Sequence, residues 1–138
     1  MGTSGKITTQ KDTKVLLSTL WIVVMINMLT ADILSLFIPG IFDEMLAFAG
    51  GTPIPVLMLG SAVIMELSIG MIFLSRVLKH TINRLANIVI GILTLAFVVL
   101  GGSSYPHYVF LATVEVVCLL AIIWYAWKWS APGDQPEQ

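Results

Sequence analysis

Four apolar runs of about twenty residues each limit what this chain can fold into. The runs cover about 16–38, 55–74, 81–100 and 108–127, and glycines, prolines or basic residues lie between them. At about 1.5 Å per residue, a helix of this length reaches about 30 Å, the thickness of the hydrocarbon core of a bilayer. Backbone groups in lipid must be hydrogen-bonded within the protein, and runs this long without strand-like alternation favour helices over a barrel. We therefore predict an all-α fold, a membrane four-helix bundle.

The composition agrees with a membrane protein. Hydrophobic residues make up 57% of the 138 residues and charged residues 11%, and the mean hydropathy is +0.94. A soluble domain carries about 25% charged residues. We expect one transmembrane domain at 15–129, between an N-terminal segment at 1–14 and a tail at 130–138, with about the first ten residues and the tail disordered. The expected surroundings are the lipid bilayer, with no nucleic acid partner.

The basic residues indicate the orientation. All seven Lys and Arg lie before the first run, around the connection between the second and third runs, or after the fourth, and the 39–54 and 101–107 loops have none. The positive-inside rule then predicts cytoplasmic N and C termini in a multi-pass protein of the cell inner (plasma) membrane. So strong a bias also disfavours a dual-topology dimer of the small multidrug transporter kind. The residues are Lys6, Lys11, Lys14, Arg76, Lys79, Arg84 and Lys128.

The 39–54 loop has two interpretations. It contains Ile41, Phe42, Met45, Leu46 and Phe48 around two acids, a mixture that suits a short helix lying in the outer interface. The alternative is an ordinary loop that caps the bundle. If the segment has a functional role, it is that of a lid over an opening between helices.

Three carboxylic acids lie inside the apolar runs, and no Lys or Arg lies in the same apolar stretches. They are Asp32 in LTADILSLF, Glu66 in AVIMELSIG and Glu115 in LATVEVVCLL. An acid in hydrocarbon costs about 2.5–3.5 kcal/mol on insertion scales. Counted from the outer ends of their helices, the three lie about 9, 16 and 10 Å deep. Because the depths are similar, we expect the three acids to converge.

The helical faces around the acids support an inward orientation. Asn27, Ala31, Asp32 and Ser35 fall within one sector of the first helix. Glu66 shares a stripe with Ala62 and Gly70, and small residues let a neighbouring backbone approach. The third helix has no acid but does have a polar or small stripe, which the economical arrangement also turns inward. Its members are Asn83, Asn87, Gly91 and Thr94.

Such an acid cluster predicts a site that binds protons or a ligand. Neighbouring acids in a low dielectric cannot all ionise unless a cation binds, so the cluster could hold a cation, an amine or a polar head group. The structural alternative is that protonated acids and amides only pin helices together, at about 0.6 kcal/mol per hydrogen bond. His107 and Tyr108, one to two turns above Glu115, would pass protons or orient a head group, or serve only as interface anchors. The candidate residues are Asp32, Glu66, Glu115, Asn27, Asn87, Tyr108 and His107.

Other chemistries lack their residues. A bis-histidine haem needs two histidines at one depth, but His80 and His107 are predicted on opposite sides of the membrane. A di-iron bundle uses Glu-x-x-His pairs, and neither Glu66 nor Glu115 begins one. Cys118 is the single cysteine, which excludes a disulfide within the chain and thiol–disulfide exchange through a C-x-x-C pair. We expect no metal and no cofactor.

Aromatic residues gather near the end of the fourth run. Trp124, Tyr125, Trp127 and Trp129 precede the polar tail. Tryptophan and tyrosine are enriched where a helix leaves the membrane, so we interpret all four as an interfacial belt.

Three segments resemble a known family. NMLTADILSLFIPG, MELSIGMIFLSRVLKHTINRLANI and GGSSYPHYVFLATVEVVCLLAIIWYAWKW resemble a small family of prokaryotic four-helix membrane proteins of unknown function. The resemblance covers about 16–129 and implies a fold and a location without an activity. A looser likeness in size and topology links the chain to DoxX-like membrane proteins. The helix-borne acids link it, by analogy only, to the emopamil-binding sterol isomerase class.

Three functions fit these observations. The first is an acidic, outward-accessible pocket that binds or transports a small cationic or lipophilic ligand. The second is a small membrane enzyme acting on a lipid or quinone-like substrate, with Glu66 or Glu115 as the proton donor. The third is an accessory membrane subunit with no ligand of its own. A homo-oligomer is compatible with each of them.

The orientation is testable by labelling. We expect a cysteine at Ser4 to be protected from a membrane-impermeant maleimide added outside the cell, and a cysteine at Ser103 to react, because the basic bias puts the termini inside. A Cys118→Ala background removes the native thiol, and permeabilised cells supply the control for reactivity. The reverse labelling pattern would overturn the orientation and the depth assignments.

Overall fold

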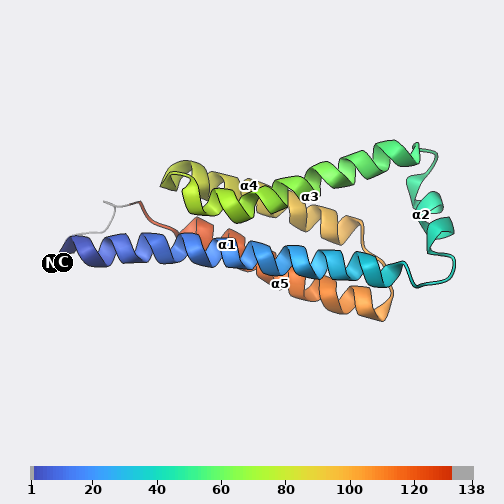
Figure 1. Ribbon diagram of the computed structural model, residues 1–138, viewed down its shortest axis with the longest axis horizontal. Coiled ribbons are helices and arrows are strands. Elements are labelled where there is room, and N and C mark those ends of the chain that lie inside the picture. Colours follow the sequence, from blue (N-terminus) through green and yellow to red (C-terminus); the bar gives the residue numbers. More distant parts are fainter. Residues whose placement is uncertain (1, 132–138) are drawn as a thin grey trace.

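The computed structural model describes residues 2–131, with the side chains of residues 10–131, and this part of the chain folds into five helices. Four of them are long and apolar enough to cross a membrane, over Gln10–Ser35, Ile54–Val77, His80–Leu100 and Pro106–Lys128. The described part of the chain is therefore all-helical, with four helices that suit a multi-pass membrane protein. The helices, coloured along the chain in Figure 1, are α1 (Gly2–Ser35), α2 (Ile41–Ala49), α3 (Ile54–Val77), α4 (His80–Leu100) and α5 (Pro106–Lys128).

The four long helices lie lengthwise beside one another. α1 packs against α3 and α5, and α4 packs against the same two helices. Figure 1 shows the start of α1, the end of α5 and the α3–α4 turn at one end of the molecule, here called the termini end. The short helix α2 lies at the opposite end, here called the α2 end, where the start of α3 leans away from α1.

Two helix boundaries of α1 differ from the sequence prediction. The helix begins at Gly2. About the first ten residues of the chain were expected to be disordered, and the apolar run starts only near 16. No proline interrupts residues 2–15, so the helix continues beyond the apolar run. It ends at Ser35 rather than near 38, because the residue before Pro39 is disfavoured in the helical conformation. Residues 132–138 of the predicted tail lie outside the described residues.

The 39–54 segment forms the short helix α2 rather than an ordinary loop. Gly40, with φ of 85°, precedes it, and Gly50, with φ of 55°, follows it, and these left-handed conformations favour glycine. Only Ile41 and Ala49, at its two ends, are buried. Apolar side chains such as Phe48 are exposed, which suits a helix lying in the interface of a membrane.

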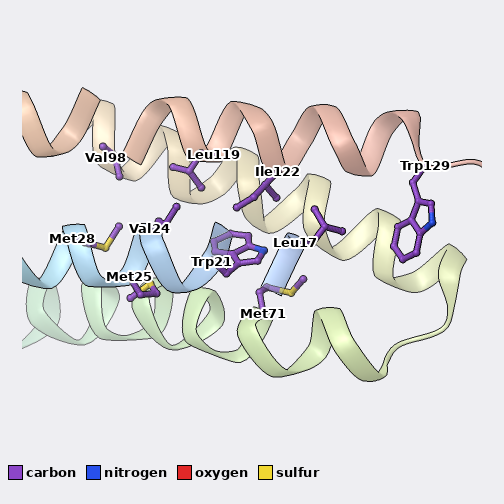
Figure 2. Close-up of a cluster of buried hydrophobic side chains, with 10 residues drawn as sticks. All are labelled: Leu17, Trp21, Val24, Met25, Met28, Met71, Val98, Leu119, Ile122 and Trp129. Carbon is purple, nitrogen blue, oxygen red and sulfur yellow. The ribbon is translucent and has the colours of Figure 1, made fainter. Parts of the chain in front are cut away.

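The apolar core is centred on α1. Leu17, Trp21, Val24 and Met28 follow one another at intervals of four, three and four residues, so they share one face of the helix. Figure 2 shows these side chains directed at those of the neighbouring helices. The other members of the cluster are Met25, Met71, Val98, Leu119, Ile122 and Trp129.

Trp129 is a core residue, and its assignment to the interfacial belt was wrong. Its side chain is 6% exposed, whereas Trp124 and Trp127 are 58% and 64% exposed. The chain leaves the helical conformation at Trp129, and its ring meets the His80 ring edge-on at 4.8 Å between centroids. Trp129 therefore closes the core at the termini end, and Trp124, Tyr125 and Trp127 remain on the surface.

A network of amides and hydroxyls ties α1, α3 and α4 together. The Asn87 side-chain oxygen accepts hydrogen bonds from Trp21 Nε1 at 2.8 Å and from Ser75 Oγ at 3.2 Å. Asn87 Nδ2 donates to Asn83 Oδ1 at 2.7 Å, and Asn83 Nδ2 donates to the Ser75 carbonyl at 2.7 Å. All four side chains are fully buried, so none can turn to water instead. The predicted inward stripe of α4 is confirmed, because Asn83, Asn87, Gly91 and Thr94 are all buried.

Replacement of Asn87 tests the network. Asn87→Leu leaves the Trp21 indole N–H and the Asn83 amide oxygen without partners, and we expect it to lower the free energy of unfolding by about 1–2 kcal/mol. The matched control is Asn27→Leu, because Asn27 Nδ2 bonds only the Val23 carbonyl of its own helix, at 2.8 Å. Unfolding in mixed detergent micelles measures both. Equal losses for the two variants would contradict a special role for Asn87.

Candidate functional site

The three acids of the apolar runs have different surroundings. Glu115 on α5 is buried, with 3% of its surface exposed. Asp32, near the end of α1, and Glu66, in the middle of α3, are exposed on the surface of this chain. The sequence contexts of the three are alike, so burial separates them only in the folded structure.

Glu66 lies outside any shared site, and the prediction that all three acids converge was wrong for it. The buried residues of α3 are Ser68, Met71 and Ser75. At about 100° per residue, Glu66 points about 160° away from Ser68 and about 140° away from Met71. Its stripe with Ala62 and Gly70 therefore faces outward, on the side of α3 opposite α1 and α4.

Asp32 of α1 and Glu115 of α5, here called the acidic pair, lie on two helices that pack against each other. His107 Nε2 lies 3.3 Å from Ser35 Oγ, so Asp32 and Tyr108 lie near the same end of that helix contact. On α5, Tyr108 and Cys118 lie seven residues before and three residues after Glu115, so the three share one face. On α1, Asp32 follows Ala31 and lies one turn after Met28, both of which are buried. These contacts place two acids from distant parts of the sequence in one region.

The Glu115 carboxyl has no hydrogen-bond partner among residues 10–131. Within those residues, the fully buried side-chain polar atom that lacks a partner is Trp129 Nε1. The Glu115 oxygens also lack a partner, but they are not fully buried. They therefore keep a small accessible surface. The carboxyl is thus not held by a hydrogen bond to a neighbouring side chain, and its oxygens are not completely enclosed.

His107 lies at the α2 end of the acidic pair. Its Nε2 is 3.3 Å from Ser35 Oγ, and this contact joins the start of α5 to the end of α1. The His107 ring stacks on Tyr105 at 6.2 Å between centroids. The Tyr105 hydroxyl in turn donates to Glu44 of α2 at 2.6 Å, and this hydrogen bond, with some burial, raises the pKa of Tyr105. Neither Ser35 nor Glu44 was identified from the sequence as a partner of this loop, because both contacts join distant segments.

The two predicted amides lie apart from the acids. Asn27 bonds its own helix, and Asn87 belongs to the network with Trp21, Ser75 and Asn83. Neither amide donates to Asp32 or Glu115 in the described structure. The prediction that amides and acids share one centre is therefore replaced by two separate groups, an amide network and an acidic pair.

Two surface hollows lie elsewhere. One, of about 670 Å³, runs along α5 and is lined by residues between Leu120 and Trp127. The other, of about 510 Å³, lies at the termini end and is lined by basic side chains. Neither contains Asp32, Glu66 or Glu115. Among the described residues, no group of three or more His, Cys, Asp or Glu side chains has the geometry to hold a metal ion.

Comparison with protein families gives one match. A family of unknown function, DUF6326, matches residues 6–134. The chain belongs to DUF6326. The match covers most of the chain and agrees with the predicted membership of a family of unknown function, but it does not show the looser likeness to DoxX-like proteins. No curated protein and no solved structure matches the chain. For this member of DUF6326, function has to be argued from the geometry described above.

Proposed function

We propose that this DUF6326 protein of the cell inner membrane binds a small lipophilic cation, in exchange for a proton, between Asp32 and Glu115. The termini end faces the cytoplasm in this proposal, because the basic residues lie there. The α2 end, with the acidic pair below it, then faces outward. The observation that carries the proposal is the burial of the Glu115 carboxyl without a hydrogen-bond partner among residues 10–131, on a helix that packs against the one that carries Asp32.

The acidic pair lacks a nearby fixed positive charge. Asp32 lies about 5 Å along the helix axis from the end of α1, and Glu115 about 14 Å from the start of α5. The nearest Lys or Arg on α5 is Lys128, about 20 Å further along the helix. A carboxyl in a low dielectric without a positive partner keeps its proton until a cation compensates its charge. A cation that enters would therefore displace a proton.

The surroundings of the pair indicate the class of ligand. Apolar residues such as Met28 and Leu119 lie nearby, and Tyr108 supplies an aromatic ring. A ligand with a positive charge and an apolar body gains both electrostatic and cation–π stabilisation in such a place. A small hydrated metal ion would need more oxygen ligands than two carboxylates and one phenol. An organic ammonium or phosphonium ion is the better match.

Exchange of cation for proton can be measured directly. When tetraphenylphosphonium is added to purified protein in weakly buffered detergent at neutral pH, we expect a pH-indicator dye to report proton release. Glu115→Gln should abolish the release and weaken binding at least about tenfold, because the amide cannot pair with a cation. Asp32→Asn should also reduce both the proton release and the binding.

The matched control is Glu66→Gln. It makes the same chemical change at the same kind of membrane position but on the outward face of α3, so binding and proton release should persist. If Glu66→Gln abolishes binding while Glu115→Gln leaves it intact, the proposed site is wrong.

A further inference from the structure

Glu66 is an exposed carboxyl at mid-membrane. It lies midway between Ile54 and Val77, the ends of α3, and about 17 Å from each along the helix axis. Among the described residues it has neither a hydrogen bond nor an ion pair. A carboxyl that faces lipid at this depth is costly, and polar groups in membrane helices usually face protein or water instead. Within the described residues, Glu66 therefore lacks the polar partner that a carboxyl at this depth requires.

The face of α3 around Glu66 has the spacing of a helix-pairing seam. Its six residues follow one another at intervals of four, three, four, three and four, the repeat that brings two helices together along a shared stripe. All are exposed or half-buried, and Leu59 and Phe73 are each 66% exposed. The seam consists of Leu59, Val63, Glu66, Gly70, Phe73 and Val77.

Gly70, the glycine of the seam, lies against no neighbouring helix of the described chain. A Cβ atom on Gly70 would meet only Leu74 of its own helix, at 4.0 Å. In contrast, a Cβ atom on Gly91 would lie 3.0 Å from Ile123, because α4 and α5 approach closely there. Gly91 thus serves a helix contact that the structure contains, whereas Gly70 leaves room for a backbone from outside the chain.

The half of α3 nearest α2 is also the least covered. All three buried residues of α3 lie between Ser68 and Ser75, in the half near the termini end. In the other half, Val56, Met58 and Val63 are more than half exposed. Figure 1 shows this part of α3 leaning away from α1. The side of α3 that carries Glu66 is therefore exposed in this half, and it is exposed again at Phe73 and Val77 in the other half.

We propose that a second copy of the chain covers this face, with α3 pairing against α3 and the two Glu66 carboxyls hydrogen-bonded to each other. Copies inserted in the same orientation can be related by a twofold axis along the membrane normal, which brings identical residues together at one depth. A protonated carboxyl carries one donor and also acceptors, so two of them satisfy each other. A different partner would need a matching polar group at this depth, whereas a second copy supplies one by symmetry.

Cysteine cross-linking tests the seam. In a Cys118→Ala background, Val63→Cys and Phe73→Cys should each form a disulfide-linked dimer when native membranes are oxidised with copper phenanthroline. The matched control is Ile92→Cys on α4, because Ile92 is 54% exposed and close to mid-membrane but away from the seam. It should remain monomeric. Equal cross-linking of all three, or dimers from Ile92→Cys alone, would overturn the proposal.

Charge substitution tests the role of Glu66 itself. Glu66→Lys places two like charges in the seam and should weaken dimerisation in detergent at least about tenfold, whereas Glu66→Gln should preserve it because two amides also pair. Leu67→Lys adds the same charge one residue away, outside the seam, and should leave the dimer intact. Unchanged dimerisation in Glu66→Lys, or equal loss in both lysine variants, would overturn the carboxyl pairing.

An independent feature, the basic hollow at the termini end, points to a second ligand. It is lined by four bases, one histidine and one glutamine, and no carboxylate lines it. Lys14 Nζ donates to the Leu78 carbonyl at 2.7 Å, and Arg76 Nε donates to Ser18 Oγ at 2.9 Å, so two of the bases are held in place. The lining residues are Gln10, Lys11, Lys14, Arg76, Lys79 and His80.

We propose that this hollow binds a phosphate group, as carried by the head group of an anionic lipid. The hollow lies where α1, α3 and α4 leave the apolar region, the level of lipid head groups. The bases at this end do not all line the hollow. Arg84 and Lys128, at the same end of the molecule, lie instead over the rings of Trp127 and Trp124.

Matched double variants distinguish a specific phosphate site from general electrostatic attraction to an anionic lipid. Lys11→Gln/Lys79→Gln should bind short-chain phosphatidylglycerol about 25-fold more weakly than the wild type, at about fivefold per base. Arg84→Gln/Lys128→Gln removes the same charge outside the hollow and should bind normally. Competition by inorganic phosphate would identify the phosphate group as the ligand, and its failure to compete would identify the whole lipid. Equal weakening in both double variants, or equal binding of phosphatidylcholine, would overturn the site.

Discussion

The hydrogen bonds of Asn87 hold three membrane-crossing helices in one arrangement. In a membrane, moving an apolar side chain from lipid into the protein interior gains little free energy, because the two surroundings are equally apolar. Directional contacts therefore decide how helices rotate against one another. Asn87, on α4, accepts hydrogen bonds from Trp21 of α1 and from Ser75 of α3. These bonds fix the inward faces of all three helices around one point.

The position of this network explains the asymmetry of the molecule. It lies toward the termini end, where Lys14, Arg76 and Ser18 add further hydrogen bonds between α1 and the end of α3. Among the described residues, no comparable set of hydrogen bonds ties α3 to its neighbours at the α2 end, and there α3 leans away from α1. The half of the protein that carries the acidic pair is thus held mainly by the contact between α1 and α5.

The carboxyls show how one residue type acquires different roles. Glu115 is turned inward on α5, toward the helices against which α5 packs, which suits the proposed exchange of a proton for a cation. Glu66 is turned outward by the same rotation of α3 that buries Ser68 and Ser75. The buried acid is therefore our candidate for ligand binding, and the exposed acid is our candidate for the contact between chains.

The sequence by itself determined the four membrane-crossing segments, because run length and hydropathy depend only on local composition. It also determined the inward stripe of α4, since Asn83, Asn87 and Thr94 are polar against an apolar background. It could not separate Glu66 from Glu115, because both are flanked by apolar residues and the lipid face of a helix is as apolar as its protein face. Trp129 was likewise ambiguous, since interfaces and cores both contain tryptophan. Only the tertiary structure decided these positions, because the rotation and tilt of each helix are set by contacts between residues far apart in the chain.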